Sequence, residues 1–461
     1  KDTDMSPDDY LISKFKDADI VLLAEDHGVK ENLDFVKKMI PKLYAHGIYM
    51  LGMEFGAYED QKQLDSLINA PRYNENLARQ LMFNYNTRWA IVEYMNLYKA
   101  AWEWNHSLPE QAKKFRVLNI SYRYNWEKFE GARTPENMKQ VFPLGNTEDF
   151  RCTLLEREVL SVHEKILVLT GTIHAFTSYR FPYYDYTSPG FVRYENRFLG
   201  NLLYDKYGNK VVSVALHQPF FNYPNQQPTL ISPAAGKLEL IMEKSQNNPI
   251  GFDLKGSHIG ELHDYSYYSM GHKDFILSDL FDGYIFLKPI RELSSCTVDY
   301  KFMDDTNWNE AVNNSPDPDW QPRPHDKEEY WRVVENFMNI EKTNDIYKKA
   351  FGIEIRKNLN AETWDDLLDI VNLRNMIVHN NGQVDKRFES TSTFRRWKDR
   401  VDIPLIKIED EDIAKLLSSV IDAVTIISNL YLKEYYQRRN RVIANYYFNK
   451  ENAYDFFADT E

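Results

Sequence analysis

The stretch Ile20-Val21-Leu22-Leu23-Ala24-Glu25-Asp26-His27-Gly28 decides the fold of the first part of this chain of 461 residues. It opens on a short, continuous apolar run that is β-branched at its start, which is typical of a strand buried on both faces of a parallel sheet. Two carboxylates and an imidazole follow the run directly. The stretch therefore predicts a core strand that ends in a polar loop.

Helical and strand-like patterns alternate after this strand. Apolar residues recur at helical spacing from Leu33 to Tyr44, and Gly47 supplies a stop signal. A second long helical pattern occupies residues 87–104. Further strand-like runs lie at residues 48–53, 115–120, 166–169, 211–216 and 284–287. This alternation predicts an α/β domain with a mainly parallel sheet flanked by helices.

A proline-rich stretch without apolar periodicity interrupts the pattern at residues 304–326. Beyond it, strand-like runs are nearly absent, and helical patterns lie at residues 331–340, 345–351, 363–379 and 413–436. We therefore expect an α/β domain over residues 1–303, a linker over residues 304–326 and an all-α helical-bundle domain over residues 327–461.

The composition excludes several classes of protein. No run approaches 18 consecutive apolar residues, so neither a transmembrane helix nor a membrane partner is expected. The two cysteines, Cys152 and Cys296, are too few for a disulfide scaffold or a cysteine-rich zinc module, and such sparse usage fits a reducing, cytoplasmic compartment. With a net charge of −13 the molecule as a whole repels polyanions, so contact with nucleic acid requires a local basic patch.

Titratable residues stand at the ends of four predicted strands. Ligands of open parallel sheets bind beyond the carboxyl ends of the strands, so we expect these residues in one crevice. They are Glu25 and His27 after the first strand, Glu54 after the second, His174 after residues 166–169 and His217 after residues 211–216. Glu25 and His27, at positions i and i+2, project to the same side of an extended segment.

Three chemistries suit this cluster. In the first, Glu25, His27, Glu54 and His174 hold a divalent metal whose bound water is the nucleophile. In the second, Glu25 orients His27 as a general base that activates water without a metal. The third is haem ligation by one of the two histidines. The remaining alternative is that these are solvated loop residues or helix caps.

Three short motifs carry a family resemblance: VLLAEDHG at residues 21–28, LGMEFG at residues 51–56 and LTGTIHAF at residues 169–176. Together they resemble the Tiki/ChaN superfamily and the related erythromycin esterases. The matching positions are Glu25 with His27, Glu54, and Gly171 with His174, while Ala24 stands where the family usually has glycine. The resemblance implies a metal-dependent peptidase, a haem-binding protein or a metal-free esterase, with a small-molecule or peptide ligand.

The second domain has its own candidate site at the end of its predicted central helix. Residues 363–379 run into Asn380-Asn381-Gly382, a strong stop signal. Asn375 and His379 share a face, whereas Arg374 lies about 140° from His379 around a regular helix. A protonated histidine at a helix C-terminus beside an arginine suits a phosphate and acid–base chemistry on a ribose. The alternative is that both basic residues cap the helix end.

This segment resembles the HEPN family, whose members carry an Arg-x4-6-His motif. The resemblance implies a helical bundle that forms a homodimer or a higher assembly with two motifs facing each other, and often an endoribonuclease that needs no cofactor. The residues carried over are Arg374, Asn375 and His379. Some members keep the motif and only bind RNA or a partner.

Four further residues are candidates for substrate binding. His217 stands at a strand end, and Arg88 suits an anionic substrate group. Arg438 and Arg439 belong to a basic cluster flanked by tyrosines, a combination that single-strand binders often show. A solvated helix face explains the basic cluster equally well.

These patterns predict a protein that joins a hydrolase or sensor domain to an RNA-cleaving or RNA-binding domain, with RNA and a second copy of the chain as partners. By analogy, such a pairing suggests a stress or antiviral defence effector. One alternative is a hydrolase of an ester or peptide bond that acts through the α/β domain alone, with the helical domain serving assembly. Another is a non-enzymatic haem- or RNA-binding protein.

Overall fold

The computed structural model describes residues 5–131, 134–184, 191–222, 229–313, 354–380, 384, 386–389, 391–402, 405–406 and 408–427. The chain divides into two compact units, one made mainly of Lys1–Gln226 and Leu230–Arg323 and the other mainly of Pro324–Arg439. The change from one unit to the other, between Arg323 and Pro324, falls in the stretch for which the sequence predicts a linker.

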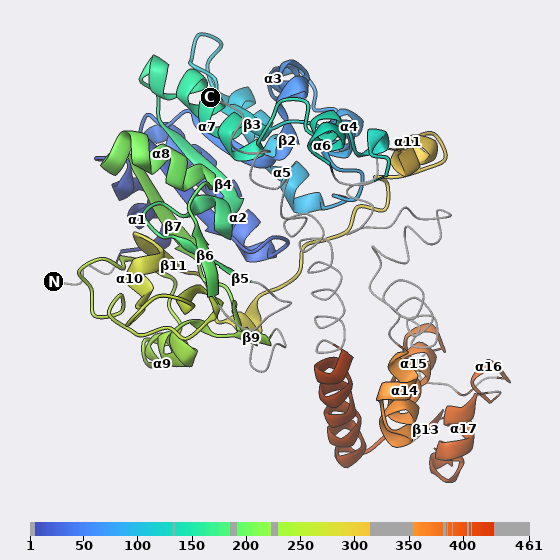
Figure 1. Cartoon of the computed structure of the whole chain (residues 1–461). Coiled ribbons are helices and arrows are strands. Elements are labelled where there is room, and N and C mark those ends of the chain that lie inside the picture. The colour runs from blue at the N-terminus through green and yellow to red at the C-terminus, as the bar shows by residue number, and fades with distance from the viewer. Residues whose placement is uncertain are drawn as a thin grey trace. The chain divides into compact units, whose positions relative to one another are not determined.

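A seven-stranded sheet forms the centre of the first unit (Figure 1). Its strand order is β10-β11-β7-β1-β4-β2-β3, and all neighbours are parallel except β10 and β11. The strands are β1 (Ile20–Glu25), β2 (Met50–Ala57), β3 (Arg116–Ser121), β4 (Ile166–Gly171), β7 (Val211–Leu216), β10 (Ile250–Asp253) and β11 (Gly283–Phe286). All six predicted strands are present. The sequence analysis missed β10, a four-residue strand that is largely not buried.

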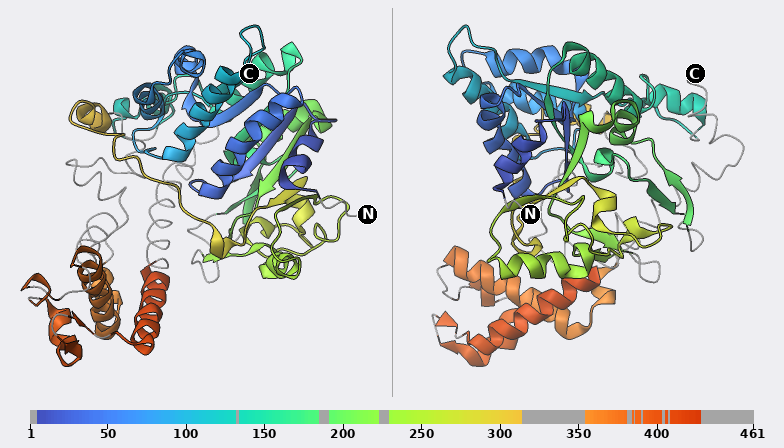
Figure 2. Two further views of the ribbon diagram at one scale, coloured as in Figure 1. Left: turned by 180° about the vertical axis from the view of Figure 1, so that it is seen from behind. Right: turned by 90° about the vertical axis from the view of Figure 1, so that its left-hand side faces the viewer.

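Helices cover both faces of this sheet, as Figures 1 and 2 show from opposite sides. The described helices of this unit are α1 (Pro7–Lys14), α2 (Lys30–Ala45), α3 (Gln61–Asn69), α4 (Glu75–Tyr85), α5 (Val92–Ser107), α6 (Pro135–Val141), α7 (Thr147–Glu158), α8 (Leu199–Tyr207), α9 (Lys237–Lys244), α10 (Leu277–Leu280) and α11 (Trp308–Asn313), and not all of them lie on the sheet. The predicted helix over residues 87–104 starts late, at Val92, because Ile91 instead forms a β-bridge with Val298. The predicted α/β fold class is confirmed.

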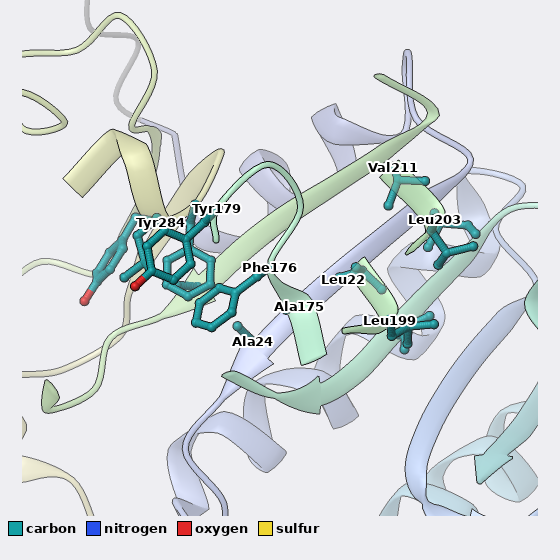
Figure 3. Packing of buried hydrophobic residues seen from close by; sticks show 14 of the residues in the cluster. Leu22, Ala24, Ala175, Phe176, Tyr179, Leu199, Leu203, Val211 and Tyr284 are labelled. Carbon is teal, nitrogen blue, oxygen red and sulfur yellow. The ribbon is translucent and has the colours of Figure 1, made fainter. Parts of the chain in front are cut away.

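Strand β1 is buried along its whole length, as its apolar run predicts. Leu22 and Ala24 belong to a core cluster that also contains Leu199 and Leu203 of α8 (Figure 3). Side chains alternate along a strand, so Val21 and Leu23 point to the opposite face, and both have no exposed surface. Burial on both faces explains why this strand carries no polar residue before Glu25.

The carboxyl ends of three neighbouring strands bring the predicted motifs together. β4 lies between β1 and β2, and Glu25 pairs in register with Gly171. Strand β2 is irregular between Met53 and Ala57, and Glu54 lies in this irregular stretch. The described part of the unit also contains two small two-stranded sheets, β5 (Phe181–Tyr184) with β6 (Phe191–Glu195) and β8 (Phe220–Asn222) with β9 (Thr229–Ile231).

The described part of the second unit is mainly helical, as predicted. It contains α14 (Ile355–Asn358), α15 (Ala361–Asn380), α16 (Lys386–Glu389), α17 (Ser392–Trp397), a helix over residues 410–427, and the short strand pair β12 (Val401–Asp402) and β13 (Leu405–Ile406). Apolar side chains of α14, α15 and the helix over residues 410–427 form one core, which includes Ile355, Trp364 and Ala423. Among the described residues, no helix combines the length and the apolar character needed to cross a bilayer.

Candidate active site

Glu25 and His27 form a hydrogen-bonded pair at the end of β1. Nδ1 of His27 lies 3.2 Å from Oε1 of Glu25. The carboxylate is 1% exposed, whereas the imidazole side chain is 36% exposed. A buried acid therefore holds one ring nitrogen of a histidine that reaches the surface.

The other ring nitrogen of His27 lies against the backbone of Gly171. A Cβ atom on Gly171 would lie 2.7 Å from both Cε1 and Nε2 of His27, a distance that real side chains do not tolerate. On its other sides the imidazole meets aromatic rings edge-on, with ring centroids 4.6 Å from Phe55 and 5.8 Å from Trp89. Phe55 and Trp89 stack on each other at 4.0 Å. The position of His27 thus depends on the absence of a side chain at Gly171 and on the aromatic wall that Phe55 and Trp89 form.

Glu54 is a fully satisfied buried anion. Its Oε2 accepts hydrogen bonds from the hydroxyl of Thr170 at 2.8 Å and from the backbone N–H of Gly171 at 2.7 Å. Its Oε1 lies 3.2 Å from Nη2 of Arg151 and 3.2 Å from Nε2 of His174. Burial by itself raises the pKa of Glu54, but the charges of His174 and Arg151 outweigh it and hold the pKa well below its usual range.

His174 lies between two carboxylates, with Nε2 at Glu54 and Nδ1 2.9 Å from Oε1 of Glu148 on α7. Burial lowers the pKa of His174, but the charges of Glu148 and Glu54 more than offset it and raise the pKa to about 9. Arg151, 2% exposed, links the same two carboxylates, since its Nη1 lies 3.0 Å from Glu148 Oε1. Two anions and two cations therefore form a balanced buried cluster.

The pKa values of Glu25 and His27, the pair at the end of β1, are both shifted upward. Burial raises the pKa of Glu25, and its hydrogen bonds to His27 and Tyr94 only partly oppose that rise. Burial lowers the pKa of His27, but the hydrogen bond to Glu25 and the charge of Glu54 outweigh it, so the net shift is upward.

Of the predicted residues, the structure thus brings Glu25, His27, Glu54 and His174 together at one rim. His217 is also buried, but its nitrogens face other partners, with Nδ1 2.9 Å from the Tyr284 hydroxyl and Nε2 3.4 Å from Glu239 Oε1. This arrangement places His217 in a separate hydrogen-bonded cluster. The reason is that β7 borders β11, which carries Tyr284.

Arg88 lies in the loop that carries Trp89, next to His27. Its backbone N–H donates to the side chain of Asn86, and the residue is half-buried. The structure therefore places this candidate for anion binding near the pair at the end of β1, one residue before the ring that contacts His27.

The residues of this rim do not fit a metal ion as they are arranged. Arg151 occupies the space between Glu54 and Glu148 where a cation would sit, and both nitrogens of His174 face carboxylates. A metal ligand must be deprotonated, so a metal or haem iron at His174 would have to displace the proton that the two carboxylates stabilise. Across the described ranges, no group of three or more His, Cys, Asp and Glu is placed to hold a metal. His27 retains one nitrogen, Nε2, that no carboxylate of the described residues holds.

Three residues of this rim were missed by the sequence analysis: Glu148, Arg151 and Tyr94. A signal for Arg151 exists, since it shares the buried face of α7 with Leu155 one turn later. A charged residue on an apolar helix face requires a buried partner of opposite charge. Nothing in the sequence near Arg151 identifies Glu54 as that partner.

The candidate site of the second unit lies largely outside the described residues. Helix α15 runs through Arg374, Asn375 and His379 to Asn380, which confirms a helix at these positions, but the description does not include their side chains. Arg438 and Arg439 lie outside the described part of the chain altogether.

Comparisons with known proteins give similarities of structure only. No protein-family model matches the chain, and no curated protein matches it. Similar solved structures include an erythromycin esterase mutant in its open conformation, with 11% identity, a TM-score of 0.43, and coverage of 64% of this chain and 95% of that one. A protein from Bacillus cereus has 12% identity, a TM-score of 0.41 and coverage of 64% and 94%. The haem-binding ChaN of Campylobacter jejuni has 15% identity, a TM-score of 0.28 and coverage of 47% and 92%.

Proposed function

We propose that the α/β unit hydrolyses a carboxylic ester or amide, with His27 as the general base and Glu25 as the group that orients it. The observation that carries this proposal is that the two ring nitrogens of His27 have different surroundings. Nδ1 is bound by the buried Glu25 carboxylate, whereas Nε2 lies at the rim of the sheet on a side chain that is 36% exposed.

The chemistry follows from this difference between Nδ1 and Nε2. Glu25 accepts the hydrogen bond from Nδ1–H, which leaves the lone pair on Nε2 to take a proton from water. The resulting hydroxide adds to the carbonyl carbon and forms a tetrahedral intermediate. When that intermediate collapses, the imidazolium returns the proton to the departing oxygen or nitrogen. The products are a carboxylic acid and an alcohol or amine, and no step requires a metal or a further reactant.

The buried cluster of Glu54, Glu148, Arg151 and His174 has a different role in this proposal. Each carboxylate is bound by cations, and His174 has no ring nitrogen without a carboxylate neighbour. We therefore assign these residues to holding the loop at Gly171 against His27, and not to proton transfer. This assignment differs from the sequence-based hypothesis in which Glu54 and His174 take part in catalysis by holding a divalent metal with Glu25 and His27.

The test uses the full chain with 4-nitrophenyl acetate and an aromatic amide as probes. We expect His27→Gln to lower kcat/KM by about 10²- to 10⁴-fold, the usual contribution of a positioned general base. His46→Gln is the control, because His46 is exposed at the end of α2 and, among the described residues, its ring bonds its own helix at the backbone oxygen of Lys42. Hydrolysis that both variants retain equally contradicts the proposal.

Haemin addition to the same proteins distinguishes the hydrolase proposal from the haem-binding alternative. If haemin addition produces a ligated absorption spectrum that His27→Gln abolishes, and neither probe is hydrolysed, the unit is a haem-binding protein and the hydrolase proposal is wrong. In the hydrolase proposal, the rate also rises with pH through the raised pKa of His27, because only the neutral imidazole accepts a proton.

For the second unit we propose RNA binding or cleavage by a homodimer. In the cleavage form, His379 is the acid or base at the 2′-hydroxyl or leaving oxygen and Arg374 stabilises the phosphorane. The supporting observation is that α15 is one uninterrupted 20-residue helix through both positions. Incubation of total RNA with the wild type and with His379→Ala tests this, and equal cleavage by both contradicts it. If cleavage depends on His379, the α/β unit would act as its sensor or as a second hydrolase, and a defence role would follow.

A further inference from the structure

Tyr94 on α5 links the two ends of the turn that carries His27. Its side chain has no exposed surface. Its hydroxyl donates a hydrogen bond to Oε1 of Glu25 at 2.6 Å and accepts one from the backbone N–H of Gly28 at 3.4 Å. Glu25 and Gly28 bracket His27 in the chain, so one hydroxyl restrains the backbone on one side of the histidine and the carboxylate on the other.

The same oxygen of Glu25 contacts both Tyr94 and His27. Oε1 lies 2.6 Å from the tyrosine hydroxyl and 3.2 Å from His27 Nδ1, whereas Oε2 is buried and has no hydrogen-bond partner among the described residues. The tyrosine bond is the shorter of the two and comes from α5, which is remote in sequence from the turn. Among the described residues, Tyr94 is the one hydrogen-bond partner of this carboxylate besides His27 itself, so the rotamer of the carboxylate depends on Tyr94.

The ring of Tyr94 also supports the aromatic wall beside His27. Its centroid lies 5.0 Å from that of Phe55 and 5.4 Å from that of Trp89, the two rings that meet the imidazole edge-on. A phenylalanine at this position keeps those ring contacts and removes only the hydroxyl. Tyr94→Phe is therefore a variant that separates the hydrogen bond from the packing.

We propose that Tyr94 is a positioning residue: its hydroxyl fixes the Glu25 carboxylate so that Oε1 faces His27 and selects the ring tautomer with the proton on Nδ1. This inference rests on the proposed function, since that tautomer leaves Nε2 to accept the proton of water. Tyr94 itself does not touch the substrate. It acts through Glu25, and its loss misplaces the base by allowing the carboxylate to rotate.

Tyr98 provides a matched control on the same helix. It lies one turn after Tyr94, has no exposed surface, and packs in the same core. Its hydroxyl, however, lies 3.5 Å from the backbone oxygen of Phe55 and not at Glu25. A role of Tyr94 in packing alone predicts that Tyr94→Phe and Tyr98→Phe have equal effects.

The first measurement is steady-state hydrolysis of 4-nitrophenyl acetate by the full chain. We expect Tyr94→Phe to lower kcat by roughly ten- to a hundred-fold while KM changes less than about two-fold, because the interaction acts on the base and not on substrate binding. Tyr98→Phe should remain within about two-fold of the wild type in both constants. Equal losses in the two variants overturn the proposal.

The second measurement needs no substrate. The ¹⁵N chemical shifts of the His27 ring, recorded where the imidazole is neutral, report which nitrogen carries the proton. We expect the Nδ1–H tautomer in the wild type and in Tyr98→Phe, and a mixture with the Nε2–H tautomer in Tyr94→Phe. An unchanged tautomer in Tyr94→Phe overturns the proposal. If the tautomer changes but no protein hydrolyses the ester, Tyr94 positions His27 as proposed and the hydrolase function is what fails.

Discussion

The position that a Cβ atom would occupy on Gly171 lies 2.7 Å from both Cε1 and Nε2 of His27. Strand β4 therefore ends in a glycine because the imidazole of a different strand end needs that space. The contact includes Nε2, so any side chain at position 171 displaces the nitrogen that we propose as the base.

Gly171→Ala should consequently lower kcat for ester hydrolysis by about a hundred-fold, the scale expected when a base moves by about 1 Å. Gly52→Ala is the control, since its Cβ would crowd Val168 and Ile166 in the sheet at 3.1 and 3.2 Å and is not near His27. We expect Gly52→Ala to lower the unfolding temperature without a selective loss of kcat. A fully active Gly171→Ala protein would show that the close approach does not position His27.

Arg151 should be essential to the stability of the first unit. Arg151 is 2% exposed, and its removal takes away one of the two cations that Glu54 and Glu148 share, leaving His174 as the other. Breaking such a buried pair from one side costs about 3–5 kcal/mol, so Arg151→Met should lower the free energy of unfolding in urea by that amount. Arg157→Met, on the same helix but at an exposed ion pair with Glu158, should change it by about 1 kcal/mol or less. Similar losses in both variants would contradict the buried-cluster interpretation.

The stability of the first unit should fall at alkaline pH because of His174. Its pKa is raised from 6.5 to about 9 in the folded chain, so protonation stabilises the fold fully below pH 6.5 and this contribution is lost as the pH rises through 9. At most about 3 kcal/mol is involved, from the size of the shift. Urea unfolding between pH 6 and pH 10 should show this fall in the wild type and in His46→Gln. The slope should be smaller in His174→Gln, where only the raised pKa of His27 still contributes with the same sign, and an unchanged slope there would assign the effect to another group.

The basic cluster at residues 395–400 of the second unit should be structural. Arg396 binds two buried carboxylates, Asp366 at 2.8 Å and Asp369 at 3.0 Å, and Trp397 Nε1 donates to Asp369 at 2.7 Å. Arg396→Met should destabilise the unit by about 2 kcal/mol, since a charged hydrogen-bond partner is lost. Arg395→Met, at an exposed position on the same helix, should leave stability unchanged. If instead Arg396→Met weakens RNA binding with no loss of stability, the cluster is a binding surface.

Much of the fold could be predicted because it depends on local periodicity. The apolar run of β1 and the helical spacing after it are properties of consecutive residues, and all six predicted strands of the sheet are present. The start of α5 could not be predicted in this way. Ile91 pairs with Val298, more than two hundred residues away, and that pairing removes residues from the helix that their spacing favours.

The sequence by itself determined that Glu25, His27, Glu54 and His174 follow core strands, and parallel strands bring such ends to one rim. Only the tertiary structure decided which of them are held as a buried charge cluster and which one keeps a free nitrogen. Arg151 meets Glu54 across 97 residues, and Tyr94 meets Glu25 across 69. The physical reason is that burial makes each charge dependent on a specific partner, and helices that pack from elsewhere in the chain supply those partners.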